Sequence, residues 1–236
     1  MTATIRLDLH VHSGYSVDSR LSFEQILERI TYQGLQGFAL TDHNTTEGLA
    51  ELDRLRSSYP GFWFLPGVEV STLEGHLLAY GVKQSPPPNR PLAETLERVA
   101  ALGGVSVLAH PFRWVHGVGR RIATDARVQG LETRNGKNSE LANTRAELLA
   151  ARRSLASTGG SDAHEPKLVG RAFTEFPNDV ASMDDLLEQV RKGQATASGA
   201  SLSFAGRVRS SVRDGILSMV RGFRPVGPRA VHPDRF

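Results

Sequence analysis

The sequence predicts one mixed α/β domain in which strands and helices alternate. Its 236 residues fall within the ~200–250 that single barrel domains commonly span. Short apolar runs of strand length alternate with segments in which apolar residues recur every three or four positions. This alternation is typical of parallel strands joined by crossover helices, and it favours either a closed β/α barrel or an open doubly wound sheet.

The first half of the chain contains four predicted strands and two predicted helices. In the first strand, residues 5–12, apolar and polar residues alternate strictly, with Ile5, Leu7, Leu9 and Val11 on one face and Asp8, His10 and His12 on the other. Ser22 and Gln25 form a capping box that begins a helix, and Gly34 ends it. The remaining elements are a strand at 38–41, a helix through Leu49, Leu52 and Leu55, and strands at 62–70 and 76–80.

The second half continues the alternation. A Pro-Pro-Pro loop at 86–88 precedes a helix, and Gly103-Gly104 separates that helix from an apolar strand at 105–109. The predicted elements that follow are strands at 131–133, 155–158 and 171–176 and helices at 143–153 and 182–192.

Composition excludes several classes of chemistry. The chain has no cysteine, which rules out disulfides, thiolate metal sites and a cysteine nucleophile. No Gly-x-Ser-x-Gly pattern surrounds a serine, so serine hydrolysis is not expected either. The N-terminus lacks the features of a secretory signal, and no apolar run approaches the ~18 residues of a spanning helix. We therefore expect a soluble cytoplasmic protein with no membrane partner.

The C-terminal region differs from the rest in charge. Residues 206–236 hold seven arginines and two aspartates, a net +5 in a chain of net +3, which leaves −2 on the rest. Val208, Val212, Ile216 and Val220 recur near helical spacing among these arginines. We predict a basic extension over 201–236 that contains a helix packed on the main domain and a flexible end. A basic amphipathic helix that binds nucleic acid is the alternative.

Histidines and acids gather where the predicted strands end. Six of the eight histidines lie at the ends of predicted strands: five lie at or just beyond the last residue, and His76 opens its strand. The candidate side chains are His10, His12, Asp18, Asp42, His43, Glu69, His76, His110, Asp162 and His164. In parallel β/α folds the carboxyl ends of strands form one rim, so these groups are expected to converge on one pocket. His116 and His232 have no such setting and are predicted to be a loop residue and an uninvolved residue.

These residue types point to a cluster of divalent ions. His10 and His12, two positions apart on a strand, can both reach one ion at ~2.0–2.1 Å from each nitrogen. A catalytic zinc site uses about three protein ligands, and nine nitrogen and oxygen donors exceed that number, so two or three ions are expected. Glu69 could bridge two of them. Imidazole suits zinc or iron and carboxylate suits manganese, so the mixture leaves the metal open.

The motifs together resemble the PHP family, the polymerase and histidinol phosphatase domain. The matching stretches are Asp8-Leu9-His10-Val11-His12-Ser13 with Asp18, Leu40-Thr41-Asp42-His43, Pro66-Gly67-Val68-Glu69 with His76, Ala109-His110-Pro111, and Gly160-Ser161-Asp162-Ala163-His164. They occur in the order found in the family and cover about residues 6–176.

The resemblance implies a distorted barrel of seven β/α units, over residues 1–200, with a site for three ions such as manganese, iron or zinc. It assigns His10, His12, Glu69 and Asp162 to one ion, Glu69, His76 and His110 to a second, and Asp18, His43 and His164 to the third. Asp162 and His164 are expected at the reacting centre. Asp42 is the third residue expected to serve catalysis, in an outer role that orients a ligand.

The chemistry expected from such a site is hydrolysis of a phosphate ester. Two ions that share a water lower its pKa toward ~7, so that hydroxide can attack phosphorus at neutral pH. Four side chains near strand ends are candidates to bind the substrate, namely Arg20, Arg113, Arg171 and, more weakly, Asn135. Lys137 follows the same strand end as Asn135.

The leading function is a phosphomonoesterase that acts on a small phosphorylated metabolite or nucleotide. An exonuclease that acts on nucleic-acid ends is the closest alternative, since the same ions would serve it. An amidohydrolase-like barrel also begins with His-x-His, but no lysine ends a central strand as a metal bridge. A non-catalytic, metal-stabilised module is the remaining alternative. The oligomeric state stays open.

Overall fold

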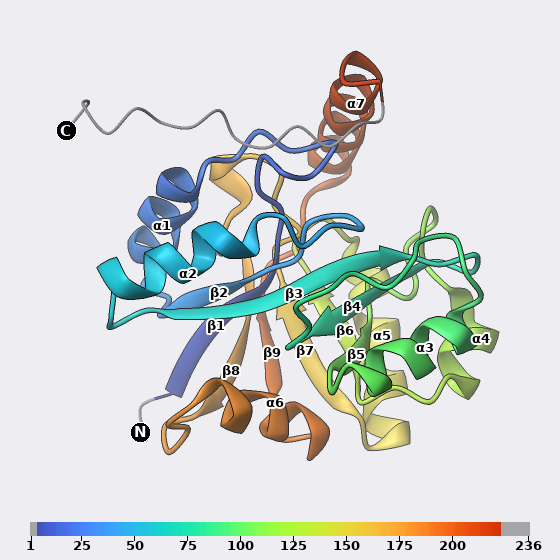
Figure 1. The fold of residues 1–236 in the computed structure, drawn as a ribbon. Coiled ribbons are helices and arrows are strands. Elements are labelled where there is room, and N and C mark those ends of the chain that lie inside the picture. The colour runs from blue at the N-terminus through green and yellow to red at the C-terminus, as the bar shows by residue number, and fades with distance from the viewer. Residues whose placement is uncertain (1–3, 223–236) are drawn as a thin grey trace.

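The structure is a computed structural model that describes residues 4–222 of the chain. Over these residues nine strands form one sheet in the order β7-β6-β5-β4-β3-β2-β1-β8-β9. The strands are β1 (Thr4–Val11), β2 (Gly37–Leu40), β3 (Trp63–Ser71), β4 (His76–Tyr80), β5 (Val105–Leu108), β6 (Gly130–Asn135), β7 (Ala156–Gly160), β8 (Ala172–Pro177) and β9 (Thr196–Gly199). The sheet curls into a nearly closed barrel, with the helices on its outside and at its ends (Figure 1).

The barrel closes where the carboxyl end of β7 meets β1. The amide of Asp162 donates to the carbonyl of His10 at 2.7 Å, and the amide of His12 donates to the carbonyl of Ala163 at 3.1 Å. The hydroxyl of Thr174 on β8 also donates to the carbonyl of Gly159 at 2.9 Å. These bonds place the end of β1 and the residues that follow β7 side by side, so that the candidate ligands of the two segments are close together. The distorted α/β barrel expected from the resemblance is confirmed, and the open doubly wound sheet is not formed.

The expectation of parallel strands throughout is wrong for half of the pairs. The pairs β1–β2, β2–β3, β5–β6 and β6–β7 are parallel, whereas β3–β4, β4–β5, β1–β8 and β8–β9 are antiparallel. Residues 72–75 alone join β3 to β4, and four residues cannot form a crossover helix, so β4 must reverse direction. The reversal brings the first residue of β4, His76, to the rim where the parallel strands end.

Seven α-helices surround the sheet in the described part of the chain. They are α1 (Phe23–Tyr32), α2 (Leu49–Ser58), α3 (Leu92–Ala101), α4 (Gly119–Asp125), α5 (Glu140–Arg153), α6 (Met183–Arg191) and α7 (Phe204–Val220). A 3-10 turn covers Pro166–Leu168. The capping box predicted at Ser22 and Gln25 is present at the start of α1. Helix α4 and strand β9 were not predicted from the sequence.

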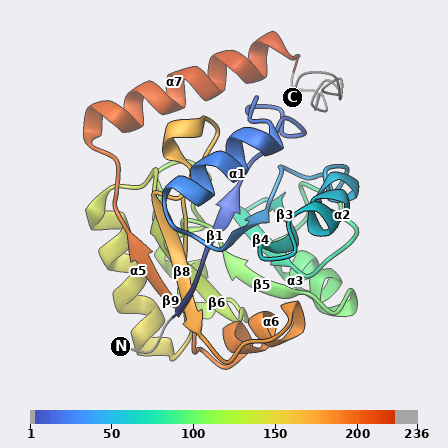
Figure 2. The ribbon, with the colours of Figure 1, turned by 90° about the vertical axis from the view of Figure 1, so that its left-hand side faces the viewer.

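The apolar core fills the barrel and closes the end opposite the site. Leu7, Leu78 and Val107 pack inside the barrel against Leu186 and Val190 of α6. Figures 1 and 2 show α6 beneath this end, whereas β1 runs toward the opposite end. Two further clusters fill the space between the sheet and the outer helices. Only the end of the barrel away from α6 is therefore left to form a site.

Strand β1 departs from strict alternation near its end. Ile5, Leu7 and Leu9 join the barrel interior as predicted, but Val11 packs in the outer cluster. The register between β1 and β2 shifts between Asp8 and Val11, which accounts for this change of face. The irregularity lies in the segment that carries His10 and His12.

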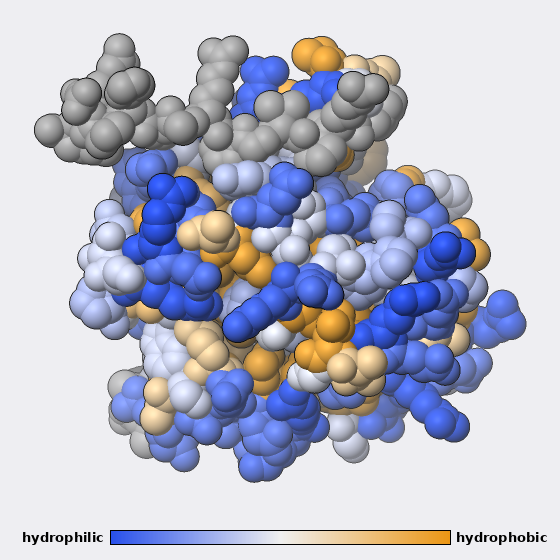
Figure 3. Space-filling model, in the orientation of Figure 1, coloured by the Kyte–Doolittle hydropathy of each residue, from blue (hydrophilic) through white to orange (hydrophobic). Residues whose placement is uncertain are grey.

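Helix α7 lies across the same end of the barrel as the end of β1 (Figure 2). It contacts the domain through polar side chains, since Ser210 and Asp214 are its buried residues. Most of its apolar residues are exposed, namely Phe204, Val208, Val212, Ile216, Met219 and Val220. Figure 3 shows hydrophobic atoms on α7 above a largely hydrophilic face of the body. The predicted extension over 201–236 thus contains a helix. Its division from the main domain at residue 200 stays a prediction. Residues 223–236, which include the end predicted to be flexible, lie outside the described residues.

Candidate metal centre

Nine side chains predicted as metal ligands converge at the open end of the barrel. They come from β1 and the loop after it, the segment after β2, β3, the start of β4, and the segments after β5 and β7. Their donor atoms form three groups, each within 4.8 Å: His12, Asp18, His43 and His164; His10, His12 and Glu69; and His43, Glu69 and His76. His110 and Asp162 adjoin these groups, through Glu69 and the β1 histidines respectively. The geometry assembles the site that the strand-end pattern predicts.

Glu69 lies at the centre of the cluster. Its Oε2 atom is 3.1 Å from Nε2 of His10, 3.2 Å from Nε2 of His12 and 3.2 Å from Nδ1 of His43. Its Oε1 atom is 2.9 Å from both Nδ1 of His76 and Nε2 of His110. A carboxylate with imidazoles on both oxygens is placed to bridge two ions.

Two further carboxylates, those of Asp18 and Asp162, complete the cluster. The Oδ2 atom of Asp18 lies 2.9 Å from Nε2 of His164 and 3.4 Å from Nε2 of His43. The Oδ1 atom of Asp162 lies 3.5 Å from Nε2 of His12 and 3.5 Å from Nδ1 of His164. Compared with the expected division of ligands, His12 and His43 each lie within reach of two of the three groups.

Buried donor atoms without hydrogen bonds show that the residues present fit cations. Within residues 4–222, five buried atoms make no hydrogen bond of acceptable geometry, although Glu69 lies close to three of them; they are His10 Nε2, His12 Nε2, His43 Nδ1, His110 Nδ1 and Asp18 Oδ1. Buried polar atoms in native proteins almost always have a partner, so several unsatisfied atoms in one place call for an explanation. Most of them face the shared space of the cluster, where a divalent ion would satisfy them.

The carboxylate Glu132 on β6 orients two of the histidines. Nδ1 of His10 donates to its Oε1 at 2.8 Å, and the backbone amide of His110 donates to its Oε2 at 2.8 Å. The bond from His10 Nδ1 to Glu132 fixes the ring of His10 with Nε2 toward the cluster. Carboxylates behind metal-bound histidines commonly have this role. Glu132 was not predicted from the sequence. The available signal was an acidic residue between Leu131 and Thr133, inside the predicted strand at 131–133.

Two aspartates support the cluster from behind. Asp42 accepts from the amide of Ser13 at 2.6 Å and from its hydroxyl at 2.7 Å. Asp8 accepts from the amides of His10, Ser161 and Gly170 at 3.2, 2.8 and 2.8 Å. These contacts hold the backbone that presents the histidines, which agrees with an outer role for Asp42.

Two ligand residues adopt backbone conformations that are unfavourable for side chains other than glycine. The φ angle is +30° at His110 and +55° at Asp162. Such conformations cost about 1–3 kcal/mol each and persist where surrounding contacts hold them. Here the bond from His110 to Glu132 and the bond from the Asp162 amide to His10 supply those contacts.

The cluster is also tightly coupled in charge. Burial lowers the pKa of His10, but the neighbouring carboxylates Glu132, Glu69 and Asp162 outweigh it and hold that pKa well above its usual range. Burial raises the pKa of Glu69, and the surrounding histidines outweigh it, so the pKa of Glu69 lies well below its usual range. Glu69 is therefore ionised and available as a ligand.

A cavity of about 580 Å³ opens in front of the metal ligands. Arg113 lines it and bonds through Nη2 to Asp162 Oδ2 and Asn135 Oδ1, both at 2.6 Å. Lys137 also lines it, with Nζ 2.7 Å from Asp214 Oδ2 on α7. Two cationic side chains, Arg113 and Lys137, thus lie directly beside the cluster.

Not all predicted substrate contacts reach this cavity. Asn135 stands behind Arg113, and Arg171 donates to the carbonyl of Ser201 at 2.6 Å. Neither Arg20 nor Arg171 lines the cavity within the described residues, so their proposed role in substrate binding is left without structural support. The sequence analysis missed Trp114 in the loop after β5 and Arg207 on α7, both of which line the cavity.

His116 lies closer to the cluster than the sequence suggested. Its ring stacks on that of His76, with centroids 4.6 Å apart and planes at 16°. It is a loop residue, as predicted, and it lines the cavity. His232 lies outside the described residues.

Comparison with known proteins identifies the family. A model described as the PHP domain matches residues 8–96, and one described as PHP-associated matches 140–195. The phosphoribosyl 1,2-cyclic phosphate 1,2-diphosphodiesterase of Eggerthella lenta is 38% identical over 98 residues, which cover 39% of this chain and 37% of that protein. The 3',5'-nucleoside bisphosphate phosphatase of Chromobacterium violaceum is 36% identical over 85 residues, which cover 34% of this chain and 29% of that protein. The chain thus spans about a third of the length of each of these two relatives.

The fold is shared with solved structures. A two-domain protein from Bacteroides vulgatus, described as containing a predicted PHP-like metal-dependent phosphoesterase, superposes with a TM-score of 0.69 at 18% identity. The match covers 90% of this chain and 70% of that one. No helix in the described residues is long and apolar enough to cross a membrane. The two family models together cover residues 8–96 and 140–195, which hold eight of the nine candidate ligands, so the chain belongs to the PHP family and is a hydrolase.

Proposed function

We propose that this hydrolase cleaves phosphate monoesters of small molecules, either a phosphorylated metabolite or a nucleotide, with two or three divalent ions at the cluster. The observation that carries the proposal is the placement of seven of the nine candidate metal ligands beside Arg113 and Lys137 in one cavity, with His10 and His12 adjoining them through Glu69. The cavity volume of about 580 Å³ suits a small ligand, since such sites commonly measure ~300–1,000 Å³. The two enzymes similar to this chain are named for reactions at phosphate esters, which supports the reaction class.

The ions expected here are manganese, iron or zinc, held by the nine side chains described above. When bound, divalent ions supply Lewis acidity and neutralise charge on the phosphoryl oxygens. Side chains of the protein would bind and orient the substrate.

Arg113 and Lys137 are placed to bind the phosphoryl group. The guanidinium of Arg113 is held in one plane by Nε to Asn138 Oδ1 at 2.9 Å and by Nη2 to Asn135 and Asp162. These bonds use three of its five N–H donors and leave Nη1 free to donate to a phosphoryl oxygen, and the group needs no reorientation because its partners fix it. Lys137 adds a point charge at the edge of the cluster, 3.4 Å from Nδ1 of His164.

The decisive experiment measures phosphate release by protein reloaded with each metal. The substrates are sugar phosphates, nucleoside monophosphates and a single-stranded oligonucleotide. We expect release from the small monoesters and its loss in Asp162→Ala, which removes a carboxylate shared by the histidines and both cations. Asp179→Ala, an exposed aspartate away from the cluster, is the matched control. Undiminished activity in Asp162→Ala would refute the assignment.

The second candidate is an exonuclease-type phosphodiesterase that uses the same site. The observation that favours it is α7, which carries Arg207, Arg209 and Arg213 and reaches the cavity through Arg207. Turnover of the oligonucleotide in preference to mononucleotides would select this function. In that case deletion of residues from Gly206 onward should weaken oligonucleotide binding and flatten its dependence on salt.

A further inference from the structure

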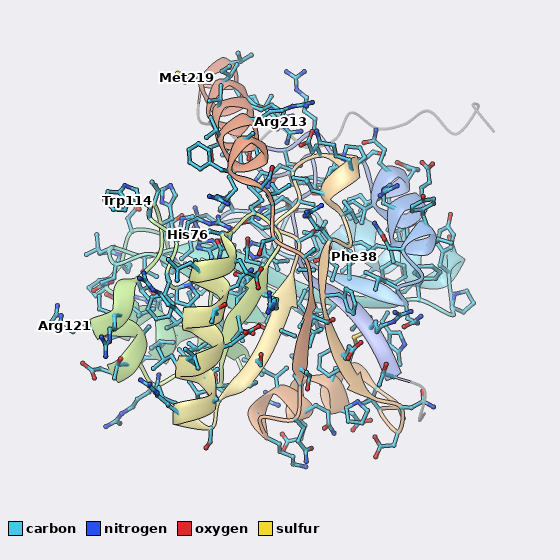
Figure 4. The ribbon with its side chains drawn as sticks, turned by 180° about the vertical axis from the view of Figure 1, so that it is seen from behind. Phe38, His76, Trp114, Arg121, Arg213 and Met219 are labelled. Carbon is cyan, nitrogen blue, oxygen red and sulfur yellow. The ribbon has the colours of Figure 1, made fainter. Side chains whose placement is uncertain are left out.

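The mouth of the metal cavity carries an exposed tryptophan. Trp114 lines the cavity, and 98% of its surface is accessible. Figure 4 shows it on the loop that passes below α7, on the same side of the molecule as His76. An indole that is exposed to this degree adds nothing to the core, and large exposed apolar side chains at a cavity mark surfaces that bind something.

The backbone on both sides of Trp114 is tightly held. The amide of Arg113 donates to the carbonyl of His110 at 2.9 Å, and the amide of the metal ligand His76 donates to the carbonyl of His116 at 3.0 Å. A Cβ atom at Gly117 would lie 2.5 Å from the carbonyl oxygen of Arg113, so only glycine permits this close approach. The loop therefore fixes the place of Trp114 relative to the metal ligands while it leaves the indole uncovered.

The α7 wall of the cavity presents a planar cation. Arg207 lines the cavity, bonds through Nη1 to the carbonyl of Leu202 at 3.0 Å and lies over the ring of Phe204, 5.5 Å from its centroid. Arg113 and Lys137 each pair with an aspartate, whereas no carboxylate within residues 4–222 pairs with Arg207. The mouth thus offers one aromatic surface and one flat positive surface, both of which favour a flat, electron-rich ring.

We propose that Trp114 is the specificity-determining residue of the site and binds a planar heteroaromatic ring on the leaving group by stacking, with Arg207 as the cationic side chain of the α7 wall. The substrate class is then a nucleoside monophosphate rather than a sugar phosphate. This inference rests on the proposed phosphomonoesterase function and adds what distinguishes one monoester from another. Every base has an aromatic face, so stacking selects nucleotides as a class without selecting one base.

The test compares adenosine 5'-monophosphate with ribose 5-phosphate. Both release a primary ribose alcohol and carry the same phosphate charge, so they differ mainly in the presence of the base. We expect wild type to favour the nucleotide in kcat/KM by about tenfold or more, and Trp114→Ala to reduce this preference by about 5- to 100-fold. Trp114→Phe, which keeps an aromatic face, should retain most of the preference. Tyr32→Ala removes an exposed aromatic residue of α1 outside the cavity lining and should leave the preference unchanged.

Calorimetric affinities for the same two compounds separate this inference from the proposed function. If wild type hydrolyses neither compound, the phosphomonoesterase function fails, and a nucleotide preference in binding that disappears in Trp114→Ala still supports stacking. If both are hydrolysed but the preference is absent, or is the same in Trp114→Ala as in wild type, the role of Trp114 is refuted and the phosphomonoesterase function stands.

Discussion

Among single residues, Glu132 has a measurable role although it is not expected to touch metal or substrate. It accepts bonds from Nδ1 of His10 and from the amides of His110 and the Asn135 side chain. In Glu132→Gln one oxygen becomes an NH₂ donor that faces another donor, so the ring of His10 loses its fixed orientation. We expect metal affinity to fall by about 10- to 100-fold while the fold is retained.

Competition with a metal-binding dye gives the affinity of Glu132→Gln, and circular dichroism reports its fold. Glu28→Gln changes an exposed glutamate of α1 and should behave as wild type. Wild-type affinity in a folded Glu132→Gln protein would contradict a positioning role.

The pKa shifts of the histidines predict that metal binding releases protons. Without metal, nearby carboxylates hold the pKa of His10 well above its usual range, and Glu69 and Asp18 raise that of His43 against the effect of burial. A raised pKa means that these imidazoles carry protons near neutral pH, and those protons must leave before the nitrogens can bind metal. Metal affinity should therefore increase as pH rises from 6 to 8. Calorimetry in buffers of different ionisation enthalpy measures the protons released, and none released at pH 7 would contradict the prediction.

Some residues of the site could be predicted from the sequence, and others could not. The convergence of the nine candidate ligands could be predicted because all but Asp18 lie at or near a strand end, a position that alternation and flanking residues reveal. Glu132 lies within a strand, and only the closed barrel brings it behind His10, 122 residues away in sequence. Trp114 follows a ligand motif by a few residues, but its exposure at the cavity becomes visible only when the loop is folded. Arg207 could not be assigned because nothing in the sequence indicates that α7 reaches the site.

Among the elements, α7 contributes to the site more than to the core. Its polar face holds Asp214 against Lys137 and Arg213 Nη1 against Glu165 Oε2 at 2.7 Å, while its apolar residues face outward. None of its residues belongs to the apolar clusters of the described chain. Deleting residues from Phe204 onward should therefore lower the free energy of unfolding by only ~1 kcal/mol, because the charged groups that remain on the barrel become exposed to water when the helix is removed.

The same deletion should raise KM for a nucleotide by about fivefold or more, since the wall that holds Arg207 is lost. The effect on kcat should be smaller because the metal ligands stay in place. Thermal melting and steady-state kinetics on the truncated protein check both parts. A fall of the melting temperature by more than 10 °C would show that α7 is part of the core after all.

The elements that the sequence missed share a physical cause. Strand β9 has only half-buried and exposed residues, so it lacks the alternation that reveals a strand. Helix α4 has a single buried residue, Ala123, and hence no apolar stripe. The antiparallel strand pairs were not predicted because strand direction depends on the length and path of the connections. Apolar periodicity carries no information about either.

For the molecule as a whole, Asp8 is a structural junction. Its carboxylate accepts amides from β1, from the end of β7 and from the loop before β8, and it is fully buried. In Asp8→Ala three buried N–H groups lose their acceptor at once. We expect the free energy of unfolding to fall by about 3 kcal/mol or more, because each unsatisfied buried group costs ~1–3 kcal/mol.

Urea unfolding of metal-free protein measures this loss without interference from bound ions. Asp53→Ala, whose side chain is largely exposed on α2, is the control and should change stability little. An unchanged unfolding midpoint in Asp8→Ala would show that water or a backbone shift replaces the carboxylate.

The convergence of ligands from β1 through β7 divides the chain into two parts that should resist proteases differently. With ions bound, coordination would join residues 10 and 164 across about 150 residues of sequence, so opening that stretch would require release of the ions, whereas α7 lies beyond the last donor. Trypsin should therefore cut metal-loaded protein first at arginines of α7 and leave a barrel fragment that accumulates. After chelation the same fragment should be degraded further, because local opening in the barrel then costs less free energy.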